Sequence, residues 1–258
     1  MSESDEAVLL TERQGGVLIM TMNRPKARNA LNGELARAIA DAVDQLEEDT
    51  SITVGILAGA GGNFCSGMDL KAFLTGETPV IGKRGLAGIT TNPPSKPMIA
   101  AIEGYALAGG CELALACDLI VASTEAKFGI PETKRSLVAG AGGLFRLPER
   151  IPPAIAMEYA LTGAFFSAEQ GHGWGMVNRL TEPGGALAGA LGLAAEIDAN
   201  GPLAVRATKQ IVANGRYWGQ DERWKRQDEL MRPVFGSADA KEGARAFAEK
   251  RAPVWKGE

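Results

Sequence analysis

The sequence predicts an α/β fold over about residues 1–200, followed by a helical region over 201–258. The first observation behind this prediction is that short apolar runs alternate with amphipathic or glycine-led segments between residues 17 and 123. Such alternation is typical of strands joined by right-handed helical crossovers. The second is that the pattern from Thr181 to the end is nearly all helical. A chain of 258 residues can enclose a sizeable core.

Short runs rich in branched apolar residues mark the strands of the first part. We expect them, in chain order, at 8–10, 17–23, 52–58, 98–103 and 119–123, with a shorter extended piece at 127–129. Apolar runs without polar alternation favour strands that are buried on both faces. Pro25 would end the pairing of the second strand, because proline lacks the N–H group that a sheet needs.

Caps and apolar spacing mark the helices that follow these strands. Asn32 is a candidate N-cap for a helix that ends near Thr50, with apolar residues every three to four positions. Short helices are expected near Met68 and over 111–116. The segment 76–94 is rich in Gly, Pro and Thr, which predicts a long loop with about one helical turn that lines a pocket.

The rest of the chain is predicted to be helical. Helices are expected to open at 140–143, to run over 151–161, to follow a cap at Ser167, and to cover 185–199, 202–213, 218–235 and 239–250. In the last of these, Asp239 and Glu242 have the spacing of a capping box.

Charge and apolar pattern exclude several classes of protein. The net charge of −4 and the pI near 5.3 argue against a nucleic-acid-binding surface. The acidic N-terminus lacks the basic and apolar regions of a secretory signal, and no apolar run reaches the ~18 residues of a membrane span. Cys65, Cys111 and Cys117 lack metal-ligand spacing, which favours buried thiols in a reducing, cytoplasmic protein. His172 is the single histidine and is expected in a loop or at the surface, so His-rich metal sites are excluded.

Glycine-rich loops suggest a nucleotide-binding site, and Ser66 and two cysteines suggest a nucleophile, but the sequence lacks the motifs that either would need. The loops at 59–64 and 140–145 have Phe where a dinucleotide fingerprint needs its third glycine, and no Walker A lysine follows either loop. Ser66 lacks the Gly-x-Ser-x-Gly elbow of a hydrolase. Neither Cys65 nor Cys111 has a histidine placed as its base.

A pair of carboxylates remains as the strongest candidate for chemistry. Glu112 falls in the first turn of a helix directly after Gly109 and Gly110, and Glu132 follows a rigid Gly-Ile-Pro segment. Glycines allow a ligand to approach the backbone, and a helix N-terminus offers free N–H groups to negative charge. Because a carboxylate in apolar surroundings is costly, both glutamates are candidates for acid–base work.

The chain resembles the crotonase (enoyl-CoA hydratase/isomerase) superfamily over nearly its whole length. The resemblance rests on Asn23-Arg24-Pro25 with Arg28-Asn29-Ala30-Leu31, on the segments 62–70 and 108–114, on Phe128-Gly129-x-Pro131-Glu132, on Gly140-Ala141-Gly142-Gly143 with Arg146-Leu147, and on Glu249-Lys250-Arg251. It implies a ββα spiral core over 1–200 that carries the active site, and a helical region over 201–258 that mediates trimerisation. The expected assembly is a homotrimer or a dimer of trimers.

The resemblance also implies roles for individual residues. The backbone N–H groups of Met68 and Gly109 would form an oxyanion hole for the thioester carbonyl of an acyl-CoA. Glu112 and Glu132 would hold a water molecule, one taking its proton and the other serving the α-carbon. The residues expected to bind substrate or CoA are Arg24, Ala27, Arg28, Ser66, Asp69, Leu70, Gly110 and Lys250. No metal or redox cofactor is implied, because the CoA thioester is itself the substrate.

The presence of both glutamates favours an enoyl-CoA hydratase. The alternatives are a carnitinyl-CoA dehydratase-like or isomerase reaction at the same site, or an acyl-CoA-binding protein without activity. Ala139 stands where the family usually has proline. Lys134 and Arg135 follow Glu132 closely, and a nearby cation would lower the pKa of that carboxyl, unless both side chains point to solvent.

Overall fold

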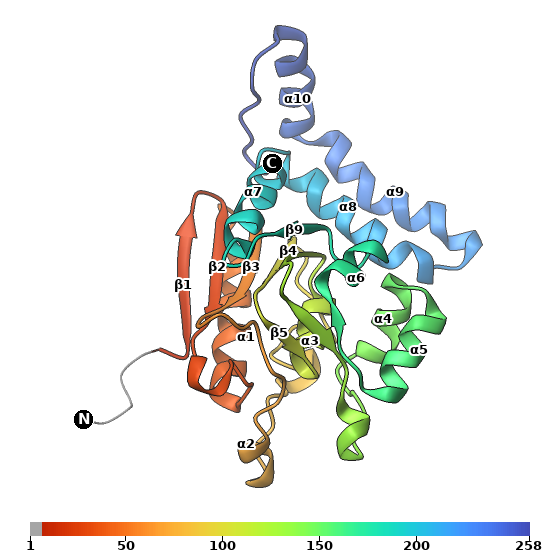
Figure 1. Cartoon of the computed structure of the whole chain (residues 1–258). Coiled ribbons are helices and arrows are strands. Elements are labelled where there is room, and N and C mark those ends of the chain that lie inside the picture. The colour runs from red at the N-terminus through yellow and green to blue at the C-terminus, as the bar shows by residue number, and fades with distance from the viewer. Residues whose placement is uncertain (1–6) are drawn as a thin grey trace.

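The computed structural model describes residues 7–258, and its core is a six-stranded sheet in the order β1-β2-β3-β4-β6-β9 (Figure 1). The strands are β1 (Leu9–Gln14), β2 (Val17–Met22), β3 (Val54–Gly59), β4 (Met98–Ile102), β6 (Leu119–Ser123) and β9 (Arg179–Thr181). Only β1 and β2 pair antiparallel; the other neighbours are parallel. The central strands are buried along their length, as their apolar runs predict.

A second, three-stranded sheet follows the order β5-β7-β8. It contains β5 (Tyr105–Leu107), β7 (Lys127–Gly129) and β8 (Phe166–Ser167). The chain leaves β4 for β5 at Gly104, whose φ of 54° allows a sharp turn against the Gly62 carbonyl. Strand pairs followed by a helix repeat along the chain, so the predicted ββα spiral is confirmed.

The helices and helical turns are as follows. The α-helices are α1 (Gly33–Glu48), α2 (Leu70–Leu74), α3 (Gly109–Ala116), α4 (Gly143–Arg150), α5 (Pro153–Thr162), α6 (Ala168–Gly173), α7 (Ala186–Asp198), α8 (Pro202–Asn214), α9 (Gln220–Gly236) and α10 (Ala238–Glu249). The 3₁₀ turns are η1 (Pro25–Ala27), η2 (Gly82–Arg84), η3 (Glu132–Arg135) and η4 (Gly215–Tyr217). Asn32 caps α1 as predicted, because its side chain accepts the N–H of Leu35 at 3.0 Å.

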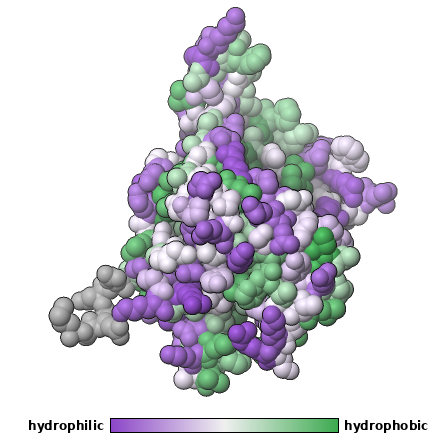
Figure 2. All heavy atoms as spheres, in the orientation of Figure 1, coloured by the Kyte–Doolittle hydropathy of each residue, from purple (hydrophilic) through white to green (hydrophobic). Residues whose placement is uncertain are grey.

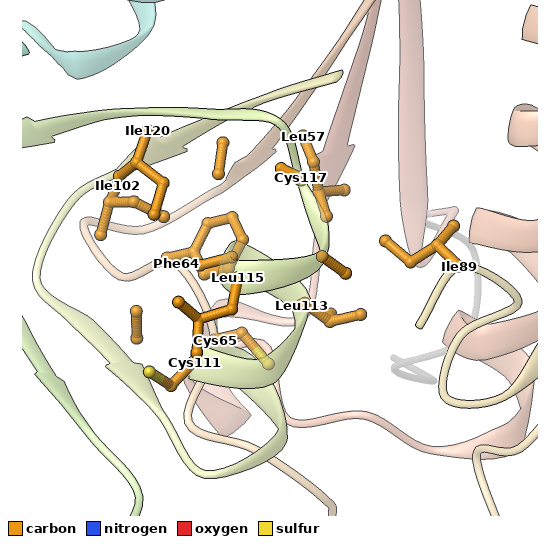
Figure 3. Packing of buried hydrophobic residues seen from close by; sticks show 14 of the residues in the cluster. Leu57, Phe64, Cys65, Ile89, Ile102, Cys111, Leu113, Leu115, Cys117 and Ile120 are labelled. Atoms are coloured by element: carbon orange, nitrogen blue, oxygen red, sulfur yellow. The ribbon is translucent and has the colours of Figure 1, made fainter. Parts of the chain in front are cut away.

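The main core encloses α3, all of whose residues are buried. Figure 3 shows Leu113 and Leu115 of this helix among Phe64, Ile102 and Ile120 from the surrounding strands and loops. All three cysteines are buried there without disulfides, as the sequence predicts. A smaller core on the other face of the large sheet packs alanines of α7 against β3 and β4. Helix α3 is therefore a rigid support for whatever its N-terminus faces.

The C-terminal helices project from this core (Figure 1). Helices α8 and α9 bury no residue of their own in the chain, although Lys209 of α8 forms an ion pair of 2.6 Å with Asp118. Several large apolar side chains of this region are exposed, with Trp224 at 71% and Phe247 at 87%. Apolar surface of this extent is typical of a protein–protein contact.

Two features of the fold differ from the sequence prediction. The short strands β5, β8 and β9 were not expected, because two or three residues carry no period. His172 is exposed at the surface, as the sequence predicts; it lies in α6, and its Nδ1 contacts the Val177 carbonyl oxygen at 2.8 Å. Asp239 is not an N-cap: Ser237 caps α10, and the buried carboxylate of Asp239 accepts the N–H groups of Lys256 and Gly257.

Two expectations concern membranes and export. No helix in residues 7–258 is long and apolar enough to span a bilayer. The acidic N-terminus, in which the sequence shows no secretory signal, lies outside the described residues.

Candidate active site

A cavity of about 800 Å³ opens beside the N-terminus of α3. It brings together four residues that the sequence singles out for chemistry, namely Met68, Gly109, Glu112 and Glu132. The loop predicted at 76–94 lines it through Thr78, Pro79, Val80, Gly82, Gly85, Leu86, Thr90 and Thr91. The pocket-lining role expected for that loop is therefore confirmed.

Two backbone N–H groups lie side by side at this cavity. The Cβ position of Gly109 is 3.7 Å from the Met68 nitrogen, and that of Gly67 is 3.3 Å from the Gly109 nitrogen. Neither the Met68 N–H nor the Gly109 N–H donates a hydrogen bond to another residue between 7 and 258. The pair is therefore open to a ligand oxygen, with the N-terminus of α3 adding positive potential.

Local backbone strain holds these two groups in place. Ala108 has φ 52° and ψ −128°, a conformation that costs an alanine on the order of 1–3 kcal/mol. Its N–H is fixed by the Gly129 carbonyl at 2.9 Å. Gly67, with φ 100°, is fixed by hydrogen bonds on both sides of Leu31: its carbonyl accepts the Leu31 N–H, and the Leu31 carbonyl accepts the Asp69 N–H.

Glu112 lies one turn into α3 and is 3% exposed. Its Oε1 accepts the N–H of Ala141 at 2.7 Å and that of Gly143 at 2.9 Å. Burial raises the pKa of this carboxyl, and the two N–H groups and the Arg146 cation only partly oppose it. The carboxyl group is therefore held in a fixed position with an affinity for protons above the ordinary one.

Glu132 is the first residue of η3 and is half-buried. Burial first, and the charge of Glu112 in addition, raise the pKa of Glu132 to about 7. Its Oε2 is buried and has no hydrogen-bond partner among the described residues. Near neutral pH this carboxyl is therefore able both to give and to take a proton.

The basic neighbours of Glu132 do not lower its pKa overall. Arg135 acts in that direction, but it is exposed, and burial of the carboxyl outweighs it. Lys134 instead lies over the Phe165 ring, with Nζ 5.6 Å from the ring centroid. The lowered pKa considered from the sequence is thus wrong. Ala139 is buried in the main core and does not line the cavity.

The residues expected to bind CoA are only partly brought together. Arg28, Ser66 and Leu70 line the cavity. Arg24 does not, because its guanidinium donates to Asp69 at 3.0 Å and to the Ala30 carbonyl. Burial alone would raise the pKa of Asp69, but the Arg24 guanidinium and two N–H groups of α2 outweigh it and hold that pKa below its ordinary value.

Three others of that set also lie outside the cavity wall. Ala27 accepts the Ser66 hydroxyl at 3.3 Å and so fixes a residue that does line it. Gly110 is small because a Cβ there would overlap the Cys65 carbonyl. Lys250 ends α10, on the helical region that projects from the core (Figure 1).

The glycine-rich loop at 140–143 is a functional element that sequence reasoning missed. It supplies both N–H donors to Glu112, and Gly142, with φ 100°, directs the N-terminus of α4 toward that carboxylate. The available signal was a glycine run opening a helix, which is typical of an anion site. Here the anion is a side chain of the same protein rather than a nucleotide.

Gly143→Ala should lower kcat about tenfold or more. The new Cβ would lie 3.0 Å from Glu112 Cγ and 3.2 Å from Oε1, so the carboxylate must shift, and small misplacements of a reacting group are costly. Steady-state kinetics with an acyl-CoA of the kind that the sequence resemblance implies measures the effect. Gly192→Ala in α7, where nothing lies within 4 Å, is the control and should keep full activity. Equal activity of the two variants would contradict the prediction.

The apolar rim of the cavity is formed in part by α2. Leu70 and Phe73 line the cavity, and Leu74 is 84% exposed beside them. Apolar side chains gather at the end of the molecule where α2 lies (Figure 2).

Among residues 7–258, no group of three His, Cys, Asp or Glu side chains is arranged to hold a metal ion.

Comparison with known proteins identifies the family. The family model described as "Enoyl-CoA hydratase/isomerase" matches residues 12–258. The enoyl-CoA hydratase EchA19 of Mycobacterium tuberculosis is 44% identical over 95% of this chain and 94% of its own. A carnitinyl-CoA dehydratase of Salmonella arizonae is 42% identical over the full length of both. The crystal structure of enoyl-CoA hydratase EchA1 from Mycobacterium marinum superposes with a TM-score of 0.96 at 60% identity, over 98% of this chain and 100% of that one.

The chain therefore belongs to the enoyl-CoA hydratase/isomerase family of enzymes. The family that the sequence motifs predict is confirmed.

Proposed function

We propose that this enzyme is an enoyl-CoA hydratase, which adds water reversibly to a 2-enoyl-CoA to give a 3-hydroxyacyl-CoA. One observation carries the proposal: two carboxyl groups with raised pKa share a cavity with two unpaired backbone N–H groups. An isomerase needs one group to move a proton along the acyl chain. Hydration needs two, one for the attacking water and one for the α-carbon.

The geometry supports a division of work. The Met68 and Gly109 N–H groups bind the thioester oxygen and stabilise the negative charge that forms on it when water attacks the β-carbon. Glu112, whose carboxylate accepts two N–H bonds, takes a proton from that water. Glu132, whose pKa is raised to about 7, gives its proton to the α-carbon. Proton exchange between the two carboxyl groups through the next water restores the starting state.

Carnitinyl-CoA dehydration is the second candidate, because relatives of that name match the chain along its full length. The charged side chains around the cavity do not favour a cationic acyl chain over a neutral one. Glu112 and Glu132 are the acidic residues among its described lining, and Arg28 and Arg135 line it too. Two of the aromatic rings that line the cavity and could hold a trimethylammonium group already carry protein cations, with Arg28 over Tyr105 at 5.7 Å and Lys134 over Phe165 at 5.6 Å.

A matched pair of substrates tests both candidates. Purified enzyme should lower the enone absorbance of crotonyl-CoA and of 5,5-dimethylhex-2-enoyl-CoA, and mass spectrometry should show the gain of one water. The 4-trimethylammonio-butenoyl thioester has the same shape with a positive charge, and its kcat/KM should be at least about tenfold lower, because desolvating a cation beside other cations is costly. A kcat/KM ratio in favour of the cation would select the dehydratase. If the protein bound these thioesters tightly but converted none of them, it would be an acyl-CoA-binding protein without activity.

Several parts of the proposal rest on family resemblance. We propose that Arg24, Ala27, Asp69 and Gly110 support the CoA-binding surface from behind, and that Lys250 approaches a CoA phosphate of a neighbouring subunit. Residues 201–258 would form the contact of a homotrimer or dimer of trimers, to which their exposed apolar side chains are suited. A cytoplasmic location and independence from metal and redox cofactors complete the proposal.

A further inference from the structure

Arg146 of α4 lies behind the cavity wall and joins two of the loops that form it. Its Nη1 donates to the Ala141 carbonyl at 3.2 Å, and its Nη2 donates to the Thr90 carbonyl at 2.5 Å. It does not line the cavity itself. A guanidinium presents its donors in a rigid fork, so the two carbonyl groups are held at a fixed separation.

One of these loops holds Glu112. Arg146 binds this loop at the Ala141 carbonyl. The N–H groups of Ala141 and Gly143 in the same loop supply both hydrogen bonds to Glu112. Gly142 leaves room for the guanidinium, because a Cβ there would overlap Arg146 Nη1. The position of Arg146 therefore bears directly on the position of the carboxylate.

The other loop reaches the pair of backbone N–H groups. The Thr90 hydroxyl accepts the Leu86 N–H at 2.8 Å, and Leu86 Cδ2 lies 3.0 Å from the Cβ position of Gly109. Thr90 is 2% exposed, so this connection is shielded from water. Arg146 thus links the support of Glu112 to the packing around Gly109.

We infer that Arg146 is a positioning residue that fixes Glu112 relative to the Met68 and Gly109 N–H groups. The expected change in kcat rests on the proposed function. The expected change in the position of Glu112 does not. The charged and titratable groups that face Arg146 are Glu112 from α3, Glu149 and Arg150 from α4, Tyr217 from η4 and the Cys117 thiol. Of these, Glu112 is the one in the cavity, where it also faces Glu132 and the Cys111 thiol.

Three variants test the inference. Arg146→Met loses the charge and both bonds, and should lower kcat about 10- to 100-fold with KM within about threefold, because misplacement of a reacting group acts on the transition state. Arg146→Lys keeps the charge and should lose less. Arg150→Lys is the control, since Arg150 lies one turn further on α4 and donates to the Leu115, Cys117 and Asp118 carbonyls, away from Glu112. It should leave kcat within about twofold.

The pH dependence separates positioning from loss of stability. Removing the cation beside Glu112 raises the pKa of that carboxyl, so the acid limb of the kcat profile should move to higher pH in Arg146→Met and stay in place in Arg146→Lys. An unmoved limb with unchanged kcat in a folded Met variant would overturn the inference, as would an equal loss in Arg150→Lys.

A readout without turnover keeps the inference apart from the proposed function. The Glu112 carboxyl signal in ¹³C-glutamate-labelled enzyme, assigned with Glu112→Gln, should titrate at higher pH in Arg146→Met than in the parent. If the parent hydrates no enoyl-CoA but this shift is seen, the proposed function fails and the positioning role stands. If the parent is active and neither the shift nor the kinetic change occurs, Arg146 has no such role.

Discussion

Glu132→Gln should lower kcat for hydration by about 10²–10⁴-fold and, at pH 8, make the enzyme more stable. The kinetic loss is the usual size for removing a general acid. The gain in stability follows from the pKa of about 7, which lies above the value of 4.5 for a free carboxyl. The folded protein holds a proton there that the unfolded chain releases, so stability falls as pH rises from about 4.5 through 7.

A glutamine carries no charge at any pH, so the variant avoids the cost of ionising a buried carboxyl. We expect the variant to exceed the parent by about 1–2 kcal/mol at pH 8, a value reduced because water reaches part of the group, and to equal it near pH 4.5. Urea unfolding at fixed protein concentration at both pH values measures the difference. Glu125→Gln, at an exposed site, is the control and should change neither quantity. A stability difference that does not depend on pH would contradict the raised pKa.

Gly67→Ala should lower kcat by about 10²–10³-fold, the cost of losing one oxyanion donor. The added Cβ would lie 2.7 Å from Ala108 Cβ, 3.0 Å from the Leu107 carbonyl and 3.3 Å from the Gly109 nitrogen. Two of those neighbours are backbone atoms that cannot turn away, so the Met68 and Gly109 N–H groups must move apart. Binding of an acyl-CoA ground state should weaken much less than kcat falls, because the oxyanion forms in the transition state.

Gly62→Ala separates this effect from backbone strain. Gly62 also has a positive φ, 73°, but nothing lies within 4 Å of its Cβ position. The strain of an alanine in that conformation should cost about 1 kcal/mol of stability and leave kcat unchanged. If both variants lost activity equally, the loss would come from general destabilisation rather than from the N–H pair.

The sequence predicted the residues of the cavity better than the reason for their behaviour. Glu112 and the pair Gly109-Gly110 stand out because a charged residue follows a glycine turn inside an apolar helix, a local pattern. The raised pKa of Glu132 was not predictable, because Lys134 and Arg135 are its neighbours in sequence but not the groups that dominate its surroundings. Burial by residues far along the chain decides the direction.

The same limit applies to parts of the fold. The central strands and α1 were predictable from runs and caps, since those signals lie within the element itself. The strands β5, β8 and β9 form only because they pair with other strands; β8, for example, has two residues and pairs with β7. Asp239 shows the limit at a helix end: its spacing to Glu242 matches a cap, yet its carboxylate binds a segment near residue 256.

The ββα spiral distributes the proposed catalytic groups over successive turns, and this bears on how the enzyme acquires activity during folding. Met68 follows β3, Gly109 and Glu112 follow β4 and β5, and Glu132 follows β7. The position of each of these residues depends on pairing between strands that are distant in sequence. Such pairing forms late in folding, because the entropy of closing long loops opposes it. A partly folded chain with its helices formed still lacks an aligned donor pair. Catalytic activity should therefore return with the last step of refolding and not in increments.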